Sequence, residues 1–114
     1  MEIVESKSGA AHVFSLSGRL DATTSGQLEK VVVERLQAGT NLLLFDLSKL
    51  QYISSAGLRV LAMTLKQVSA SEGRMALCGL QEPVKMVFDI SGFTSFFRIA
   101  ASLEDALASV SQTK

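Results

Sequence analysis

The paired serines Ser54-Ser55 are the strongest candidates for a chemical function in this sequence. They follow an apolar segment with the character of a β-strand and precede apolar residues at helical spacing, so they lie where a helix begins. The first N–H groups of a helix are unpaired and favour a nearby negative charge. No histidine lies close in the sequence to activate either hydroxyl as a nucleophile. This combination indicates a serine that receives a phosphate rather than one that attacks a substrate.

A serine at this position can also be a simple helix N-cap, which stabilises a helix by about 1 kcal/mol. Two features favour a functional interpretation. Two hydroxyls stand where one cap is sufficient, and the small residues Ala56 and Gly57 leave the backbone open to the active site of another protein. A phosphate would suit the helix N-terminus but would add roughly two negative charges to a surface that a partner must desolvate. The pattern therefore predicts a switch that controls binding.

Other catalytic and metal-binding patterns find no support. The segment Ser-Ala-Gly-Leu departs from the Gly-x-Ser-x-Gly nucleophile motif, and the glycines are spread singly, without a phosphate-binding loop. His12 and Cys78 each stand alone, without a partner at metal-ligand spacing. We expect a strand histidine near the surface and a core thiol. The sequence therefore predicts no enzyme activity, no cofactor and no metal site.

The composition predicts one folded domain over residues 1–114. Hydrophobic residues make up 47% of the chain and charged residues 19%, which favours folding over disorder. The net charge is zero and the Lys and Arg residues are scattered, so nucleic-acid binding is disfavoured. Short apolar runs, an N-terminus without an apolar signal region and a single cysteine predict a cytoplasmic protein without membrane spans. The neutral surface favours a monomer.

The hydrophobic pattern predicts alternating strands and helices. The expected strands are Ile3–Ser6, Ala11–Leu16, Leu42–Asp46, Met75–Cys78 and Phe96–Ile99. The expected helices follow a capping box at Thr24 and Gln27, the Ser54-Ser55 pair, Pro83 in a first helical turn, and a second capping box at Ser102 and Asp105. Residues 18–21 are expected to form a loop. The alternation predicts an α/β domain with some parallel strand pairing.

Four segments, with the spacing between them, resemble the anti-anti-sigma factors, or anti-sigma factor antagonists, of the bacterial STAS-domain family over essentially the whole chain. These segments are Leu16–Asp21, Leu44–Ser48, Tyr52–Leu58 and Val84–Gly92. The resemblance implies a single STAS domain of the α/β class. Its mixed β-sheet of four to five strands begins with a strand pair and packs against four to five α-helices.

The resemblance also implies a function. Members bind a serine kinase of the histidine-kinase-like ATPase fold that doubles as an anti-sigma factor. The unphosphorylated form captures this kinase and frees the sigma factor, phosphorylation breaks the complex, and a metal-dependent serine phosphatase restores it. This partner switching is the leading hypothesis. The alternatives are an adaptor STAS domain in a transport or signalling complex without phosphate cycling, and a weak nucleotide-binding or hydrolysing domain.

The acceptor is assigned by alignment on Gly57. The family block usually reads Asp-Ser-Ser/Thr-Gly, with the phosphate on the serine that follows the aspartate. Ser55 then takes the acceptor position, Ser54 the aspartate position and Ala56 that of the second hydroxyl residue. Ser55 is the predicted acceptor and Ser54 the alternative. The missing aspartate removes a carboxylate beside the acceptor, which could change kinase preference or the rate of phosphorylation.

Further residues are carried over by the same alignment. Asp21 matches the family's loop acid, implicated in kinase contact, although a helix-entry acid is an equally good explanation. Arg59 is interpreted as a solvated side chain, a partner contact or a pair for the phosphate. Asp46 is expected to be structural. The predicted partner-binding set is Asp21, Ser54, Ser55, Ala56, Gly57 and Arg59. Most of the apolar group Met86, Phe88, Phe93, Phe96 and Phe97 is expected in the core, with Phe93 partly exposed.

Overall fold

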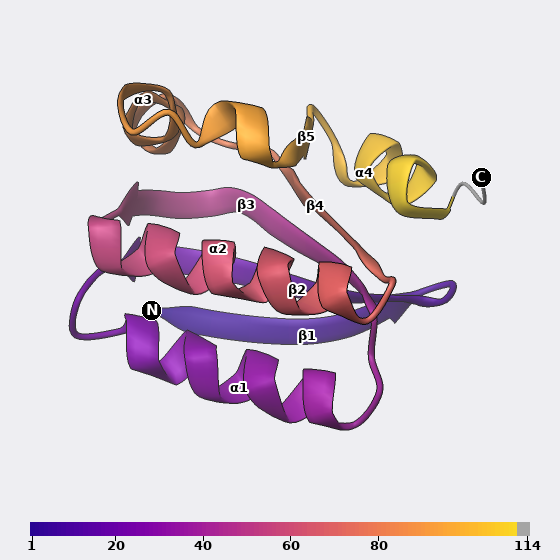
Figure 1. The fold of residues 1–114 in the computed structure, drawn as a ribbon. Helices are drawn as coiled ribbons and strands as arrows, with labels where there is room; N and C mark the ends of the chain where they lie inside the picture. Colours follow the sequence, from indigo (N-terminus) through magenta and orange to yellow (C-terminus); the bar gives the residue numbers. More distant parts are fainter. Residues whose placement is uncertain (112–114) are drawn as a thin grey trace.

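The computed structural model describes residues 1–111 and contains one mixed sheet with helices on both of its faces (Figure 1). Its strands are β1 (Glu2–Ser8), β2 (Ala11–Leu20), β3 (Leu42–Ile53), β4 (Arg74–Cys78) and β5 (Arg98–Ala100). Its helices are α1 (Ser25–Gln37), α2 (Ser55–Ala70), α3 (Glu82–Ile90) and α4 (Leu103–Ser111), with a 3₁₀ turn η1 at Thr94–Phe96. The strand order follows the sequence; β1 pairs antiparallel with β2, and all other neighbours are parallel. The predicted α/β class and mixed sheet are confirmed.

The main core lies between the sheet and three helices. Leu28 of α1, Leu61 of α2 and Phe88 of α3 are fully buried against the same face of the sheet. On that face Phe14 and Phe45 of the neighbouring strands β2 and β3 stack with their ring centroids 5.0 Å apart. This packing on the sheet fixes the directions in which α1 and α2 leave the ends of β2 and β3.

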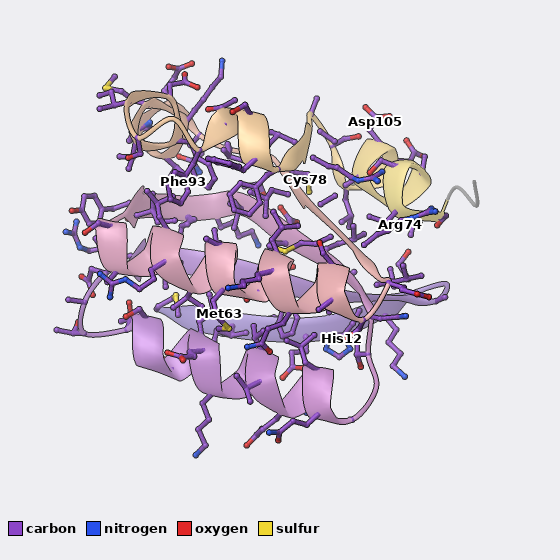
Figure 2. All side chains as sticks on the ribbon, in the orientation of Figure 1. His12, Met63, Arg74, Cys78, Phe93 and Asp105 are labelled. Carbon is purple, nitrogen blue, oxygen red and sulfur yellow. The ribbon has the colours of Figure 1, made fainter. Side chains whose placement is uncertain are left out.

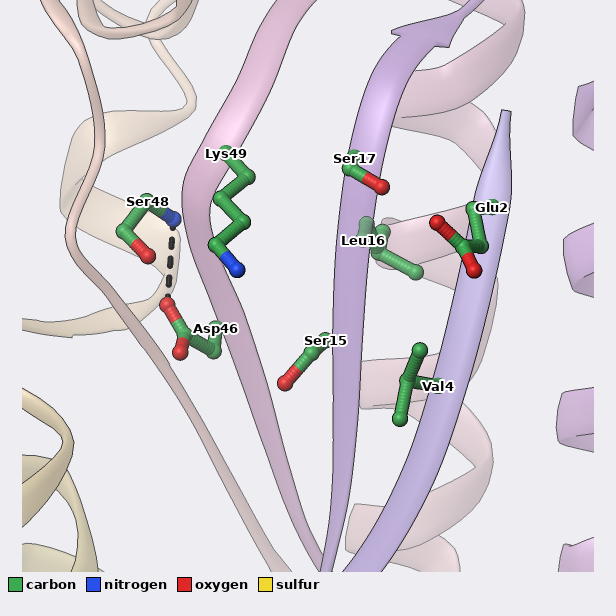
Figure 3. A pocket seen from close by; sticks show the side chains of 8 residues that line it. All are labelled: Glu2, Val4, Ser15, Leu16, Ser17, Asp46, Ser48 and Lys49. Carbon is green, nitrogen blue, oxygen red and sulfur yellow. Dashed lines mark hydrogen bonds between the residues drawn. The ribbon is translucent and has the colours of Figure 1, made fainter.

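The opposite face of the sheet is only partly covered. Helix α4 has nine residues, and its Ala106 and Val110 pack over the central strands. The part over β1, β2 and β3 is left as a groove of about 230 Å³ (Figure 3). Its lining residues are Glu2, Val4, Ser15, Leu16, Ser17, Asp46, Ser48 and Lys49. These are mainly hydroxyl and charged residues, which suit a solvated sheet face, and they include none of the candidate residues.

Strands β2 and β3 run further than the sequence predicts. Residues 18–20 belong to β2 rather than to a loop, and β3 continues seven residues beyond Asp46. The pairing contains two irregularities, between Ser15 and Ser17 and between Gly18 and Arg19. Gly18 has a φ of 94°, a conformation that glycine adopts without strain. These bulges interrupt the alternation of apolar and polar residues, which is why the pattern indicated a loop.

The two predicted capping boxes have different outcomes. Thr24 occupies the N-cap position of α1, but its side chain makes no capping hydrogen bond. Its hydroxyl donates to the carbonyl oxygen of Arg19 at 2.9 Å and accepts from the backbone N–H of Asp21 at 2.9 Å, so this prediction is wrong. At the start of α4, the Asp105 N–H donates to the Ser102 hydroxyl at 3.1 Å, which confirms Ser102 as a cap.

The aromatic region after β4 is more exposed than predicted. Phe88 and Phe97 are buried and Phe93 is half-buried, as expected. Met86 and Phe96, however, are 55% and 66% exposed, so the prediction that most of this apolar group lies in the core is wrong. Met86 lies two residues from Phe88 on α3 and therefore points away from the buried face. Phe96 belongs to η1, and the last strand begins only at Arg98.

His12 is buried in β2, more deeply than the expected position near the surface (Figure 2). Its Nε2 lies 2.7 Å from Oε1 of Glu5, and the Nε of Arg35 donates to the same oxygen at 2.7 Å. The hydrogen bond from Arg35, with that of His12, holds the pKa of Glu5 below its usual value. The cluster therefore ties β1, β2 and α1 together.

Cys78 lies on the face of β4 that α4 covers, and it is 1% exposed (Figure 2). Burial, with the nearby Asp46 carboxylate, raises the pKa of the thiol to about 11. The expected core thiol is therefore confirmed. Within residues 1–111, no group of three His, Cys, Asp or Glu side chains could hold a metal ion.

The Cys78 thiol predicts a loss of stability at high pH. The pKa of the thiol in the unfolded chain is 9.0, and below that pH the thiol is protonated in both the folded and the unfolded state. Between pH 9 and 11 only the unfolded chain loses the proton, which favours unfolding by about 1.4 kcal/mol per pH unit. Urea unfolding should therefore show about 2 kcal/mol less stability at pH 10.5 than at pH 8 from this group. The Cys78→Ala variant is the control, because the pH dependence of its stability comes only from the other titrating groups. An equal pH dependence of stability in both proteins would contradict the prediction.

Candidate functional site

The candidate residues gather where the parallel strands end. Leu20 at the end of β2 is the register partner of Ile53 at the end of β3, and the Ser54 N–H donates to the Leu20 carbonyl at 2.9 Å. Asp21 follows Leu20 directly, and Ser55 lies two residues after Ile53. Helices α1 and α2 begin at this edge of the sheet, at the left of Figure 1. The sheet register therefore brings the predicted loop acid and the serine pair to one edge of the sheet.

The two serines have different environments. Ser54 is the N-cap of α2, with extended backbone angles, and its Oγ accepts from the Gly57 N–H at 3.4 Å. Ser55 is the first residue of the helix and is exposed. Its hydroxyl makes no hydrogen bond with any residue of the described chain 1–111. Ser54 thus fills the structural role of a cap, and the hydroxyl of Ser55 is accessible.

Gly57 allows α2 to approach the strand ends closely. A Cβ atom at this position would lie 2.7 Å from Cγ of Leu20, 2.9 Å from Cγ1 of Ile53 and 3.0 Å from the Leu20 carbonyl oxygen. Gly57 is buried and Ala56 is half-buried. The glycine therefore has a packing role, and direct contact of these two residues with a partner stays a prediction.

Asp21 is fixed by the turn that leads into α1. Its Oδ1 accepts from the hydroxyl of Thr23 at 2.8 Å, from the Thr23 N–H at 3.0 Å and from the Thr24 hydroxyl at 3.2 Å. These hydrogen bonds, that of the Thr23 hydroxyl first, hold the pKa of Asp21 below its usual value. The carboxylate is therefore charged and held in one orientation at the edge that carries Ser55.

Arg19 and Tyr52 were missed by sequence reasoning. They are register partners in β2 and β3, and the guanidinium carbon of Arg19 lies 4.2 Å from the centroid of the Tyr52 ring. The Arg19 side chain is 62% exposed, and its Nε is 3.6 Å from Oδ2 of Asp21. A cation held over an aromatic ring is favoured by cation–π attraction. Both residues lie in segments that carry the family resemblance, but the expected loop at 18–21 concealed their pairing.

Arg59 lies on the exposed surface of α2, four residues after Ser55. It borders a small groove of about 140 Å³ between α1 and α2. The other lining residues are Ser25, Glu29, Ala56, Val60 and Met63. Arg59 forms no ion pair with any other residue in 1–111. Asp46 accepts from the Ser48 N–H at 3.0 Å, the structural role expected of it, although it lies within β3 and not at its end.

No helix in the described part of the chain is long and apolar enough to cross a membrane.

Comparisons with known proteins agree with this architecture. Residues 3–106 match the model of the STAS domain. BtrV of Bordetella bronchiseptica, provisionally named an anti-sigma factor antagonist, is 37% identical over 108 residues, which cover 95% of this chain and 93% of BtrV.

Two solved structures show the same fold. An anti-sigma factor antagonist from Mycobacterium paratuberculosis aligns with a TM-score of 0.89 and 23% identity, over 97% of this chain and 94% of that one. The Bacillus cell fate determinant SpoIIAA in its phosphorylated form aligns with a TM-score of 0.74 and 20% identity, over 96% of this chain and 99% of the SpoIIAA chain. Together with the match over residues 3–106 and the likeness to BtrV, these findings show that the chain belongs to the STAS domain family.

Proposed function

We propose that this chain is an anti-sigma factor antagonist whose binding is switched by phosphorylation of Ser55. The unphosphorylated form binds an anti-sigma factor that is also a serine kinase of the histidine-kinase-like ATPase fold, and a sigma factor is thereby released. Transfer of a phosphate to Ser55 ends this binding, and a serine phosphatase restores it. The protein acts as a binding partner and a phosphate acceptor, and the kinase supplies the catalysis.

The observation that carries this proposal is the division of roles between the two serines. Ser54 accepts the hydrogen bond that caps α2, whereas Ser55 is exposed with its hydroxyl unused. In the transfer, the Ser55 oxygen forms a bond to the γ-phosphorus of ATP, the bond to the ADP oxygen breaks, and the hydroxyl proton passes to the kinase. Helix α2 loses nothing from the modification of Ser55, because its cap is on another residue.

The charge of the site supports a switch that acts on the interface. The first turn of α2 contains no acidic residue, so a phosphate there meets unpaired N–H groups without a like charge on the same turn. The domain itself tolerates the added charge. A partner that covers Ser55 must desolvate roughly two negative charges, which opposes binding.

The partner class is supported by the relatives. BtrV and the Mycobacterium paratuberculosis protein are both named for antagonism of an anti-sigma factor. An adaptor STAS domain has no need for an accessible hydroxyl at the start of α2, so Ser55 favours phosphate cycling over the adaptor alternative. The surface offered to the partner contains Ser55 with Asp21, Ser54 and Arg59 around it, and the chain acts as a monomer.

The acceptor assignment is tested with ATP and the cognate kinase. We expect one phosphate per chain, localised by mass spectrometry to Ser55, and no incorporation into Ser55→Ala. Ser54→Ala is the matched control, because it removes the neighbouring hydroxyl and about 1 kcal/mol of capping but leaves the acceptor. Incorporation into Ser55→Ala at the wild-type rate would show that the site is misassigned. Tight binding of the kinase without any phosphate transfer would favour the adaptor alternative.

A further inference from the structure

The start of α2 is the positive end of the helix dipole, and no negative charge in the first turn of the helix balances it. The helix has no acidic residue in its first turn, and its cap is one long hydrogen bond of 3.4 Å from a neutral hydroxyl. Arg59, the fifth residue of the helix, adds a cation to the end where cations are least favoured. Within residues 1–111 this guanidinium has no ion-pair partner. An anion on Ser55 would relieve each of these features.

Helix geometry places Arg59 within reach of such an anion. Residues four apart on a helix are neighbours on one face, with Cβ atoms about 5–6 Å apart. Side chains on a helix also lean toward its N-terminus, which is the direction from Arg59 to Ser55. Both residues are exposed. A long arginine side chain and a phosphate can therefore meet without any change in the backbone.

We propose that Arg59 is the internal counter-ion of a phosphate on Ser55, an inference that rests on the proposed function of Ser55 as the acceptor. The planar guanidinium can donate two parallel hydrogen bonds to phosphate oxygens. Phosphorylation then changes two groups of the binding surface at once. A neutral hydroxyl becomes an anion, and a free guanidinium becomes a paired one that is no longer available to the partner.

Other charged groups near the site define the rival explanations. Glu29 of α1 borders the same groove as Arg59, but the two form no ion pair. Asp21 lies at the same edge of the sheet and repels a phosphate. Arg19 is the rival cation, but it is already held over Tyr52 and beside the Asp21 carboxylate. Of these two arginines, Arg59 is the one that makes no ion pair or cation–π contact within residues 1–111.

The test uses the full chain with phosphoserine inserted at position 55 during translation, followed by ³¹P NMR titration at low salt. A free phosphoserine has a second pKa of about 6. We expect Arg59→Gln to raise the phosphate pKa by on the order of 0.3 unit relative to the wild-type chain, and Arg59→Lys to keep part of the difference. Lys66→Gln is the matched control, because Lys66 is exposed on the same helix eleven residues beyond Ser55. Its removal should leave the phosphate pKa unchanged.

The outcomes separate this inference from the proposed function. An unchanged phosphate pKa in Arg59→Gln overturns the inference, and so does an equal or larger shift in Arg19→Gln. Because the phosphoserine is installed without a kinase, these results hold whatever the kinase accepts. A failure of the proposed function appears instead in the kinase assay, as the absence of phosphate on Ser55.

Discussion

Replacement of Gly57 by alanine is expected to lower the free energy of unfolding by about 2–3 kcal/mol. The added Cβ would lie within 3.0 Å of two core side chains and of the Leu20 carbonyl oxygen, which belongs to the β2 backbone. Leu20 and Ile53 are fully or almost fully buried and have little room to move. The helix must therefore shift away from the strand ends, and with it the position of Ser55. Urea unfolding of the variant measures the loss.

Gly26 provides the matched control. It also lies in the first turn of a helix, but a Cβ at Gly26 would meet no atom within 4 Å. Gly26→Ala should therefore gain up to about 1 kcal/mol from the better helix propensity of alanine. A loss below about 0.5 kcal/mol in Gly57→Ala would show that α2 can move freely relative to the sheet. The role of Gly57 in positioning Ser55 would then be wrong.

The alternation of strands and helices was predictable because each element has a regular pattern of buried residues. The apolar run at residues 42–45 indicated a strand covered on both faces, and Leu28, Val32 and Leu61 marked the inner faces of α1 and α2. The junction at Ser54-Ser55 was predictable for a related reason. A polar pair between a strand pattern and a helix pattern has few places to lie other than at a helix N-terminus.

The features that were missed depend on contacts between distant segments. The extension of β2 and β3 requires bulges at Ser15–Ser17 and Gly18–Arg19, which break the alternation that marks a strand. The Arg19–Tyr52 contact exists only because of this cross-strand register. The hydroxyl of Thr24 bonds to Arg19 and Asp21 instead of capping α1, because the turn offers it closer partners. The single sequence contains no local signal for these choices.

The structure also distinguishes the environments of the two serines. Sequence spacing left Ser54 and Ser55 as alternative acceptors, because both stand at the junction. The hydrogen bond from Gly57 to Ser54 and the exposure of Ser55 give the two hydroxyls different roles. The aspartate that the family pattern places at position 54 is replaced by a residue that still serves as an N-cap, since serine and aspartate cap helices about equally well. The substitution therefore preserves the start of α2 and removes one charge beside the proposed acceptor, Ser55.

Ser55→Asp is expected to weaken binding of the anti-sigma factor kinase on the order of 100-fold, as measured by titration calorimetry. The carboxylate places a negative charge on a surface that the partner must desolvate, as a phosphate does with roughly twice the charge. The fold should be unaffected or gain a few tenths of a kcal/mol, because an anion is favourable at a helix N-terminus. Loss of binding and retained thermal stability are thus expected in the same variant.

Ser69→Asp is the control for net charge, since Ser69 is exposed in the last turn of the same helix. Fourteen residues of helix place it about 21 Å from Ser55, beyond the screening length of about 8 Å at physiological salt. It should bind the partner as the unmodified protein does, and lose a little stability because an anion is unfavourable at a helix C-terminus. Equal weakening in both variants would assign the effect to overall charge. Severe unfolding of Ser55→Asp would mean that position 55 cannot accommodate a charge in the folded protein, and the switch would have to be placed elsewhere.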